Sequence, residues 1–266
     1  MRLSPTERRT LAVETILALF SDESSTVRSG VLEALGEILH TFLGDPDGPP
    51  NELVHLFLGR KEDCRVRDGQ PEPFLPGCKK TLQTPSESFF TDPNRPLICA
   101  FNFPAVALTL GGERWCEIRE VYLEIASNPS SSVRRTLAAS LGEIAKIIGP
   151  EQARTDLLDV WWTSIKSDDK EVRMKAIECL YDLVGVVGKE VGKALMQGLL
   201  TMWNKGTFCG WRERELVGQN LFGWINLLGL EGVSLARAFL AKGLEDSAAA
   251  VRDTAVTAVG FIFETL

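Results

Sequence analysis

Apolar side chains recur along this chain at the three- and four-residue spacing of an α-helix. Ile118, Tyr122 and Ile125 form one such stripe, and residues 133–148 carry a second. Between them, 127–132 is rich in serine and offers side chains that cap the second helix. The first helices expected in the other pairs lie at 6–20, 51–58, 156–165, 191–202 and 235–244. No segment alternates apolar and polar residues long enough for a strand, so the pattern predicts an all-α protein.

An arginine at the head of the second helix of each pair marks an internal repeat. Arg134 is followed by further arginines at steps of 39, 39 and 40 residues. The full set is Arg28, Arg95, Arg134, Arg173, Arg212 and Arg252. Two helices of this length cannot bury both apolar faces alone, so neighbouring pairs must stack. The repeat predicts one α-solenoid of about six units over residues 1–266.

Most of these arginines follow an acid or an amide at a fixed distance. The pairs are Asp22 with Arg28, Asn128 with Arg134 and Asp246 with Arg252, while Ser167 or Asp168 precedes Arg173. We expect these side chains to hydrogen-bond the arginines across the turn and between successive units. An Asp and an Arg on either side of the turn resemble the HEAT repeat, which implies a right-handed superhelix of helix pairs.

One long segment departs from the repeat. Residues 59–94 mix glycine, proline and charged side chains and lack helical or strand periodicity. Nine of the thirteen prolines fall between Gly44 and Pro96, so the break in pattern coincides with a shift in composition. We therefore expect a flexible insertion at 59–94 within the second unit.

Composition and charge narrow the function classes. The 29 basic and 36 acidic side chains give a formal charge of −7, which argues against binding to nucleic acid or to an acidic membrane. No apolar run of about 18 residues predicts a membrane span. Six scattered cysteines without a close pair, two histidines and no apparent secretion signal indicate reduced thiols and no metal site. We expect a cytoplasmic protein, with a nuclear location left open.

Catalytic motifs are sparse. Gly185-Val186-Val187-Gly188-Lys189 resembles a phosphate-binding loop, but its spacing is short and Glu190 stands where a hydroxyl residue is needed. No nucleophile elbow, zinc-protease motif or dinucleotide fingerprint occurs. The sequence therefore predicts a protein that is not an enzyme and holds no cofactor.

Trp211 stands out among the tryptophans. Trp115, Trp161 and Trp203 lie on apolar stripes and are expected in the core. In the 39-residue alignment Trp211 occupies a place that other units give to valine, next to Arg212. Tryptophan beside arginine on a ridge of turns is typical of a binding hot spot. Alternatively, Trp211 caps a local groove and Arg212 is only the repeating arginine.

The segment from about 98 to 258 resembles the protein phosphatase 4 regulatory subunit 1 family, which is related to the HEAT-repeat scaffold subunit of protein phosphatase 2A. The matching residues are Pro-Ala-Val-Ala-Leu-Thr-Leu-Gly at 104–111, Trp115, Arg119-Glu120 with Tyr122, and Val-Arg-Arg-Thr-Leu-Ala at 133–138. Members of that family are considerably longer, so the chain corresponds to a portion of one.

The resemblance implies a non-catalytic scaffold that binds the catalytic subunit of a serine/threonine phosphatase of type 4 or 2A and influences substrate choice. Other regulatory subunits are further candidate partners. In the related scaffold the catalytic subunit docks on turns between paired helices, one of which carries Trp-Arg-x-Arg. By this resemblance Trp211, Arg212 and Arg214 are the expected docking residues. The alternative is a HEAT-repeat adaptor or karyopherin-like carrier, which would need acidic ladders on its inner helices.

Overall fold

The protein is built from helices that fall into two compact units. The structure, a computed structural model, describes residues 5–59 and 94–265. Every regular element in these ranges is a helix, which confirms the all-α prediction. The units are Met1–Asn128 and Pro129–Leu266, and each is described by itself. Apart from its end residues, the insertion expected at 59–94 lies outside the described residues.

The first unit packs its helices around a cluster of aromatic rings. Its elements are α1 (Pro5–Phe20), α2 (Ser25–His40), α3 (Asn51–Leu58), α5 (Arg95–Leu110), the 3₁₀ turn η2 (Gly112–Arg114) and α6 (Trp115–Ala126). Phe103 meets Phe57 and Tyr122 edge to face, with ring centroids 5.7 and 5.1 Å apart. Edge-to-face pairs of buried rings add to the stabilisation from burial alone, so they fix α3, α5 and α6 together.

A glycine lets α2 and α5 approach closely. The amide of Asn102 donates to the carbonyl oxygen of Leu32 at 3.1 Å. A Cβ added at Gly36 would lie 2.5 Å from the Asn102 Oδ1, a distance that real contacts do not allow. The small residue on α2 therefore makes room for a buried polar bridge to α5.

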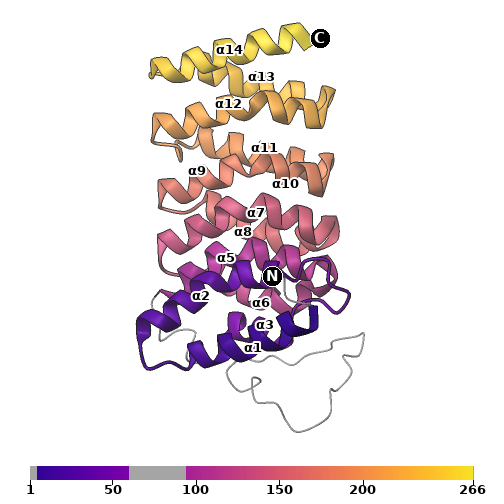
Figure 1. The fold of residues 1–266 in the computed structure, drawn as a ribbon. Coiled ribbons are helices and arrows are strands. Elements are labelled where there is room, and N and C mark those ends of the chain that lie inside the picture. The colour runs from indigo at the N-terminus through magenta and orange to yellow at the C-terminus, as the bar shows by residue number, and fades with distance from the viewer. Residues whose placement is uncertain (1–4, 60–93, 266) are drawn as a thin grey trace. The chain divides into compact units, whose positions relative to one another are not determined.

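The second unit arranges its helices in two layers (Figure 1). Its elements are α7 (Ser131–Gln152), the π-helical turn η3 (Ala153–Leu157), α8 (Leu158–Ile165), α9 (Lys170–Glu178), α10 (Leu180–Val187), α11 (Lys189–Asn204), α12 (Trp211–Leu228), α13 (Leu230–Leu244) and α14 (Ala249–Thr265). In one layer α7, the α9–α10 pair, α12 and α14 pack on one another in that order. In the other, α8, α11 and α13 pack against this first layer.

Glycines with positive φ separate one helix pair from the next. Gly149, Gly188 and Gly229 have φ of 84°, 90° and 67°, a region in which a Cβ is unfavourable. The sequence predicts a helix end at Gly149 and Pro150, and the backbone of α7 does leave the helical region at Gly149. The chain turns sharply at these glycines and starts the first helix of the following pair.

The tryptophans expected in the core are buried. Trp115, Trp161 and Trp203 expose 2%, 0% and 8% of their surface. The indole N–H of Trp161 donates to the carbonyl oxygen of Ala176 at 2.8 Å, so burial leaves that donor satisfied. The prediction for these three residues is confirmed.

Candidate protein-docking site

Arg28, Arg134, Arg173 and Arg252 are each the fourth residue of a second helix, and each bonds the main chain of the turn before it. Each side chain donates from Nη1 to carbonyl oxygens five or six residues earlier. The pairs are Arg28 with Asp22 and Glu23, Arg134 with Pro129, Arg173 with Ser167 and Asp168, and Arg252 with Asp246 and Ser247. Asp22, Asp168 and Asp246 thus accept from the arginine of the following helix through their main-chain carbonyl oxygens, and not through the carboxylates that the sequence predicted for this role. Arg95 departs from the predicted set, because it is the first residue of α5 and its guanidinium bonds the carbonyl oxygen of Leu56 on α3.

The acidic side chains instead join successive helix pairs. Asp246 receives two hydrogen bonds from Arg214, one pair earlier, at 2.6 Å from Nε and 3.0 Å from Nη2. These bonds hold the pKa of Asp246 below its usual value. One carboxylate oxygen also accepts the N–H of Ala248 at 2.9 Å. A contact between successive helix pairs was predicted, but the Asp246 carboxylate makes it with Arg214 and not with the predicted Arg252.

The turn before α12 is longer than its neighbours and moves the repeating arginine. Six residues, 205–210, separate α11 from α12, whereas four residues form the turns 166–169 and 245–248. As a result Arg214, not Arg212, is the fourth residue of the helix and bonds the carbonyl oxygens of Phe208 and Cys209 at 2.9 and 3.1 Å. The assignment of Arg212 as the repeating arginine is wrong, because it assumed a turn of constant length.

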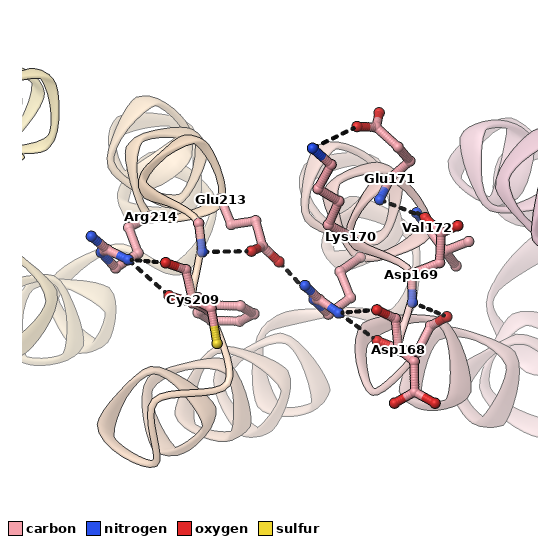
Figure 2. Close-up of polar contacts among 12 residues, drawn as sticks. Asp168, Asp169, Lys170, Glu171, Val172, Cys209, Glu213 and Arg214 are labelled. Carbon is pink, nitrogen blue, oxygen red and sulfur yellow. Dashed lines mark hydrogen bonds and ion pairs between the residues drawn. The ribbon is translucent and has the colours of Figure 1, made fainter.

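The same shift places Glu213 at the position that α9 and α14 fill with a buried valine. Val172 and Val251 expose 0% and 2% of their surface, and Glu213 exposes 2%. One oxygen of Glu213, Oε1, accepts from Arg173 Nε at 2.6 Å (Figure 2). The other, Oε2, accepts the N–H of Gly210 at 3.1 Å. Trp211 was expected at this valine position, and that expectation is wrong.

Trp211 and Arg212 form the exposed start of α12. The ring of Trp211 is 39% exposed, and the Arg212 guanidinium lies 4.4 Å from its centroid. A guanidinium over an indole face is an attractive arrangement that orders both side chains. The equivalent first two residues are Lys170 and Glu171 in α9. The turn thus presents a flat aromatic surface and a positive charge together.

Arg214 differs from the other two expected docking residues. Its guanidinium already bonds Asp246 and the carbonyl oxygens of Phe208 and Cys209. The hydrogen bonds that Arg214 donates to the Asp246 carboxylate also raise the pKa of Arg214, so its charge is stabilised where it is. The structure therefore brings Trp211 and Arg212 together on the surface and commits Arg214 to the interior of the turn.

Sequence analysis missed Glu213 and its partner Arg173, although a signal was present. Gly188 and Gly229, which separate helix pairs, lie 41 residues apart, against 39 for Gly149 and Gly188. Aligning on these glycines rather than on arginines reveals the two additional residues. The sequence gives no comparable sign that Arg173 and Glu213 form an ion pair, because the two residues lie 40 positions apart.

Within residues 5–59 and 94–265 the structure contains neither a cluster of metal-binding side chains nor a single helix suited to cross a membrane. No group of three or more His, Cys, Asp or Glu side chains in these ranges could hold a metal ion. No single helix among them is long and apolar enough to cross a bilayer. Only α5 taken together with Gly112–Ala126 meets the length and hydropathy requirements, and the two are bent by 113°.

Comparison with known proteins relates the chain to phosphatase regulators. Residues 99–202 match the family model described as the protein phosphatase 4 regulatory subunit 1 middle domain. The human serine/threonine-protein phosphatase 4 regulatory subunit 1 is 28% identical over 200 residues, 75% of this chain and 21% of the human protein. The rat protein of that name is 30% identical over 190 residues, 71% of this chain and 20% of its own. The chain spans about a fifth of the length of these relatives. Residues 205–214 lie beyond the end of the segment that matches the family model.

Proposed function

This chain belongs to the protein phosphatase 4 regulatory subunit 1 family, and from that premise we propose that it is a non-catalytic regulatory subunit. It binds the catalytic subunit of a serine/threonine phosphatase of type 4 or 2A and helps to select its substrates. The observation that supports a docking role most directly is the exposed Trp211–Arg212 pair, at the start of the helix that follows the lengthened turn 205–210.

The chemistry of this pair suits an interface. Tryptophan and arginine are the residues whose truncation most often weakens protein complexes strongly. Because the Arg212 guanidinium already lies over the Trp211 ring, less side-chain entropy is lost when a partner covers them. The outward face of the guanidinium favours an acidic or carbonyl-rich partner surface.

Arg214 enters the proposal in a different role from its neighbours. Its bonds to Asp246, Phe208 and Cys209 fix the turn from which Trp211 and Arg212 project. We assign direct contact with the catalytic subunit to Trp211 and Arg212, and support of the turn to Arg214.

The platform for this surface is proposed to be a right-handed HEAT-type solenoid. Two features of Pro129–Leu266 support it: the two helix layers, and the repeated arginine that bonds the preceding turn. A solenoid presents a ridge of such turns, so modest contacts along it can add to a stable interface.

A binding experiment tests the docking proposal. Wild type and Trp211→Ala are titrated with purified phosphatase 4 catalytic subunit, and Tyr181→Ala serves as the control because Tyr181 is a similarly exposed aromatic residue, at 43%. We expect Trp211→Ala to weaken binding by about tenfold or more, and Tyr181→Ala to bind as wild type. Circular dichroism confirms that each variant is folded. Equal affinity of wild type and Trp211→Ala would refute the proposed docking site.

A further inference from the structure

A buried ion pair stands beside the docking residues at a position that neighbouring helices fill with valine. The side chains of Arg173 and Glu213 are 11% and 2% exposed, and their Nε and Oε1 atoms are 2.6 Å apart. At the same place in α9 and α14, Val172 and Val251 are buried. Both valines serve the packing of helix pairs without any carboxylate.

Stability alone does not explain this pair. Removing two charged groups from water is costly, and replacing a buried ion pair by apolar side chains of similar volume is often neutral or stabilising. The valines at 172 and 251 show that this fold accepts such a solution. Unlike a valine, the ion pair fixes the relative positions of the groups that it joins, because hydrogen bonds are directional.

The pair acts on the residue immediately before Trp211. Besides Arg173, the Glu213 carboxylate binds the N–H of Gly210, so it is held to the end of the turn. A Cβ added at Gly210 would lie 3.0 Å from Glu213 Oε2, which makes the close approach easiest with glycine. Trp211 and Arg212 thus lie between two anchored residues, Gly210 and Glu213.

The other end of the pair is fixed to the neighbouring turn. Arg173 Nη1 donates to the carbonyl oxygens of Ser167 and Asp168 at 2.7 and 3.0 Å (Figure 2). The start of α12 is therefore tied through Glu213 and Arg173 to the turn that precedes α9.

We propose that Arg173 and Glu213 are positioning residues that hold the lengthened turn 205–210, and with it Trp211 and Arg212, in the arrangement that docks. This inference rests on the proposed function for the docking step, while the holding of the turn stands on its own. Since four-residue turns leave the chain less freedom, we infer that the ion pair compensates for the two additional residues.

The test separates positioning from docking. Arg173→Met/Glu213→Val removes both charges and restores the valine of α9 and α14. Glu213→Gln is nearly equal in volume, but it replaces one of the two accepting oxygens by an NH2 group, so either Arg173 or Gly210 faces a donor instead of an acceptor. The matched control is Lys146→Met/Asp182→Asn, which removes an ion pair of 3.0 Å between α7 and α10. Measured for each are the thermal midpoint, amide hydrogen exchange at Gly210 and affinity for the phosphatase 4 catalytic subunit.

We expect both Glu213 variants to exchange the Gly210 amide about tenfold faster, since its acceptor is lost or no longer held by Arg173. Binding should weaken by about tenfold. The thermal midpoint of the double variant should fall only by what the two lost hydrogen bonds from Arg173 to Ser167 and Asp168 contribute, because the apolar replacement of the pair itself is nearly neutral. The control should match wild type in exchange at Gly210 and in affinity.

Three results would overturn the inference. Wild-type exchange at Gly210 in both Glu213 variants would show that the pair does not hold the turn. Faster exchange with unchanged affinity, where Trp211→Ala abolishes binding, would show that holding the turn does not matter for docking. Failure of both Glu213 variants to fold would make the pair a requirement of the fold. If Trp211→Ala itself binds as wild type, the proposed function fails, and with it the docking step, while exchange still reports on the turn.

Discussion

Two turns of the unit Pro129–Leu266, 205–210 and 245–248, share the same arginine hydrogen bonds but are followed by different surface residues. In both, the fourth residue of the following helix bonds two carbonyl oxygens of the turn, Arg214 in one and Arg252 in the other. The shorter turn is followed by Ala249 and Ala250, the longer by Trp211 and Arg212. The same arginine arrangement thus carries different surface residues on the two turns.

The acid that joins helix pairs also differs between the two turns. In 245–248 it is Asp246, in the turn itself, whereas for 205–210 it is Glu213, within the helix. Glu213 stands where α9 and α14 have a buried valine, and the turn before it is two residues longer. We therefore expect a carboxylate at the position of Glu213 to be tolerated in α12 but not at the equivalent position of α14.

The largest expected effect comes from placing a glutamate at the buried valine position of α14, as α12 has it at Glu213. Val251→Glu places a carboxylate at a residue that is only 2% exposed, and Arg214, the fourth residue of α12 as Arg173 is of α9, is already bound to Asp246. We expect a loss of about 3 kcal/mol of unfolding free energy, measured by urea denaturation. Ala249→Glu, two residues earlier and exposed, is the control and should change it by less than about 0.5 kcal/mol. A similar stability for both variants would contradict the comparison.

A smaller and pH-dependent effect is expected for Asp246→Asn. Arg214 holds the pKa of Asp246 below its unfolded value, so ionised Asp246 stabilises the fold above that value and ceases to do so as pH falls through the lowered pKa. At pH 7 the variant should lose about 2 kcal/mol.

The check on Asp246→Asn is urea unfolding of both proteins from pH 7 downwards. The gap between wild type and variant should close as the pH falls below the unfolded pKa of about 3.9. A gap that stays constant with pH would mean that the charge of Asp246 contributes nothing.

Replacing glycine by alanine should lower the stability of the protein in the longer turn and raise it within a helix. Gly206 has φ of +76° and open space around a Cβ, so Gly206→Ala meets only backbone strain and should cost about 1 kcal/mol. Gly185 lies within α10, also with open space, and Gly185→Ala should stabilise by up to about 1 kcal/mol. Thermal unfolding of the two variants compares them directly, and a thermal midpoint of Gly206→Ala equal to or above that of wild type would show that the turn does not need glycine.

The smallest effect on stability is expected at Trp211, the proposed docking residue. Because 39% of Trp211 is exposed, Trp211→Ala should change the unfolding free energy by no more than about 0.5 kcal/mol. Trp203, 8% exposed and packed on Phe239, is the contrast, and Trp203→Ala should cost about 3 kcal/mol. Calorimetry of the two variants tests this. A large loss for Trp211→Ala would make that residue part of the core rather than of a binding surface.

Periodicity predicted the helices well because the burial of apolar stripes determines them. The helix expected at 51–58 has the bounds of α3, and those expected at 6–20 and 235–244 fall within α1 and α13. The break at Gly149 was also predictable, since glycine followed by proline ends a helix for local reasons.

The turn 205–210 was less predictable because its length and the burial of Glu213 depend on contacts with other parts of the chain. A constant repeat length hid the two residues added in 205–210, which shifted Arg214 into the place assigned to Arg212. Glutamate is rarely buried, so sequence alone places Glu213 on the surface. Its burial depends on Arg173, a partner from the preceding helix pair.

The most direct test of the central claim is the hydrogen-exchange footprint of the phosphatase 4 catalytic subunit on this chain. Amide exchange is measured by mass spectrometry for the free chain and for the complex. We predict that exchange slows most in peptides covering residues 205–214, with the adjacent turn 166–169 affected less. Protection confined to other regions, with 205–214 exchanging as in the free chain, would contradict docking at Trp211 and Arg212.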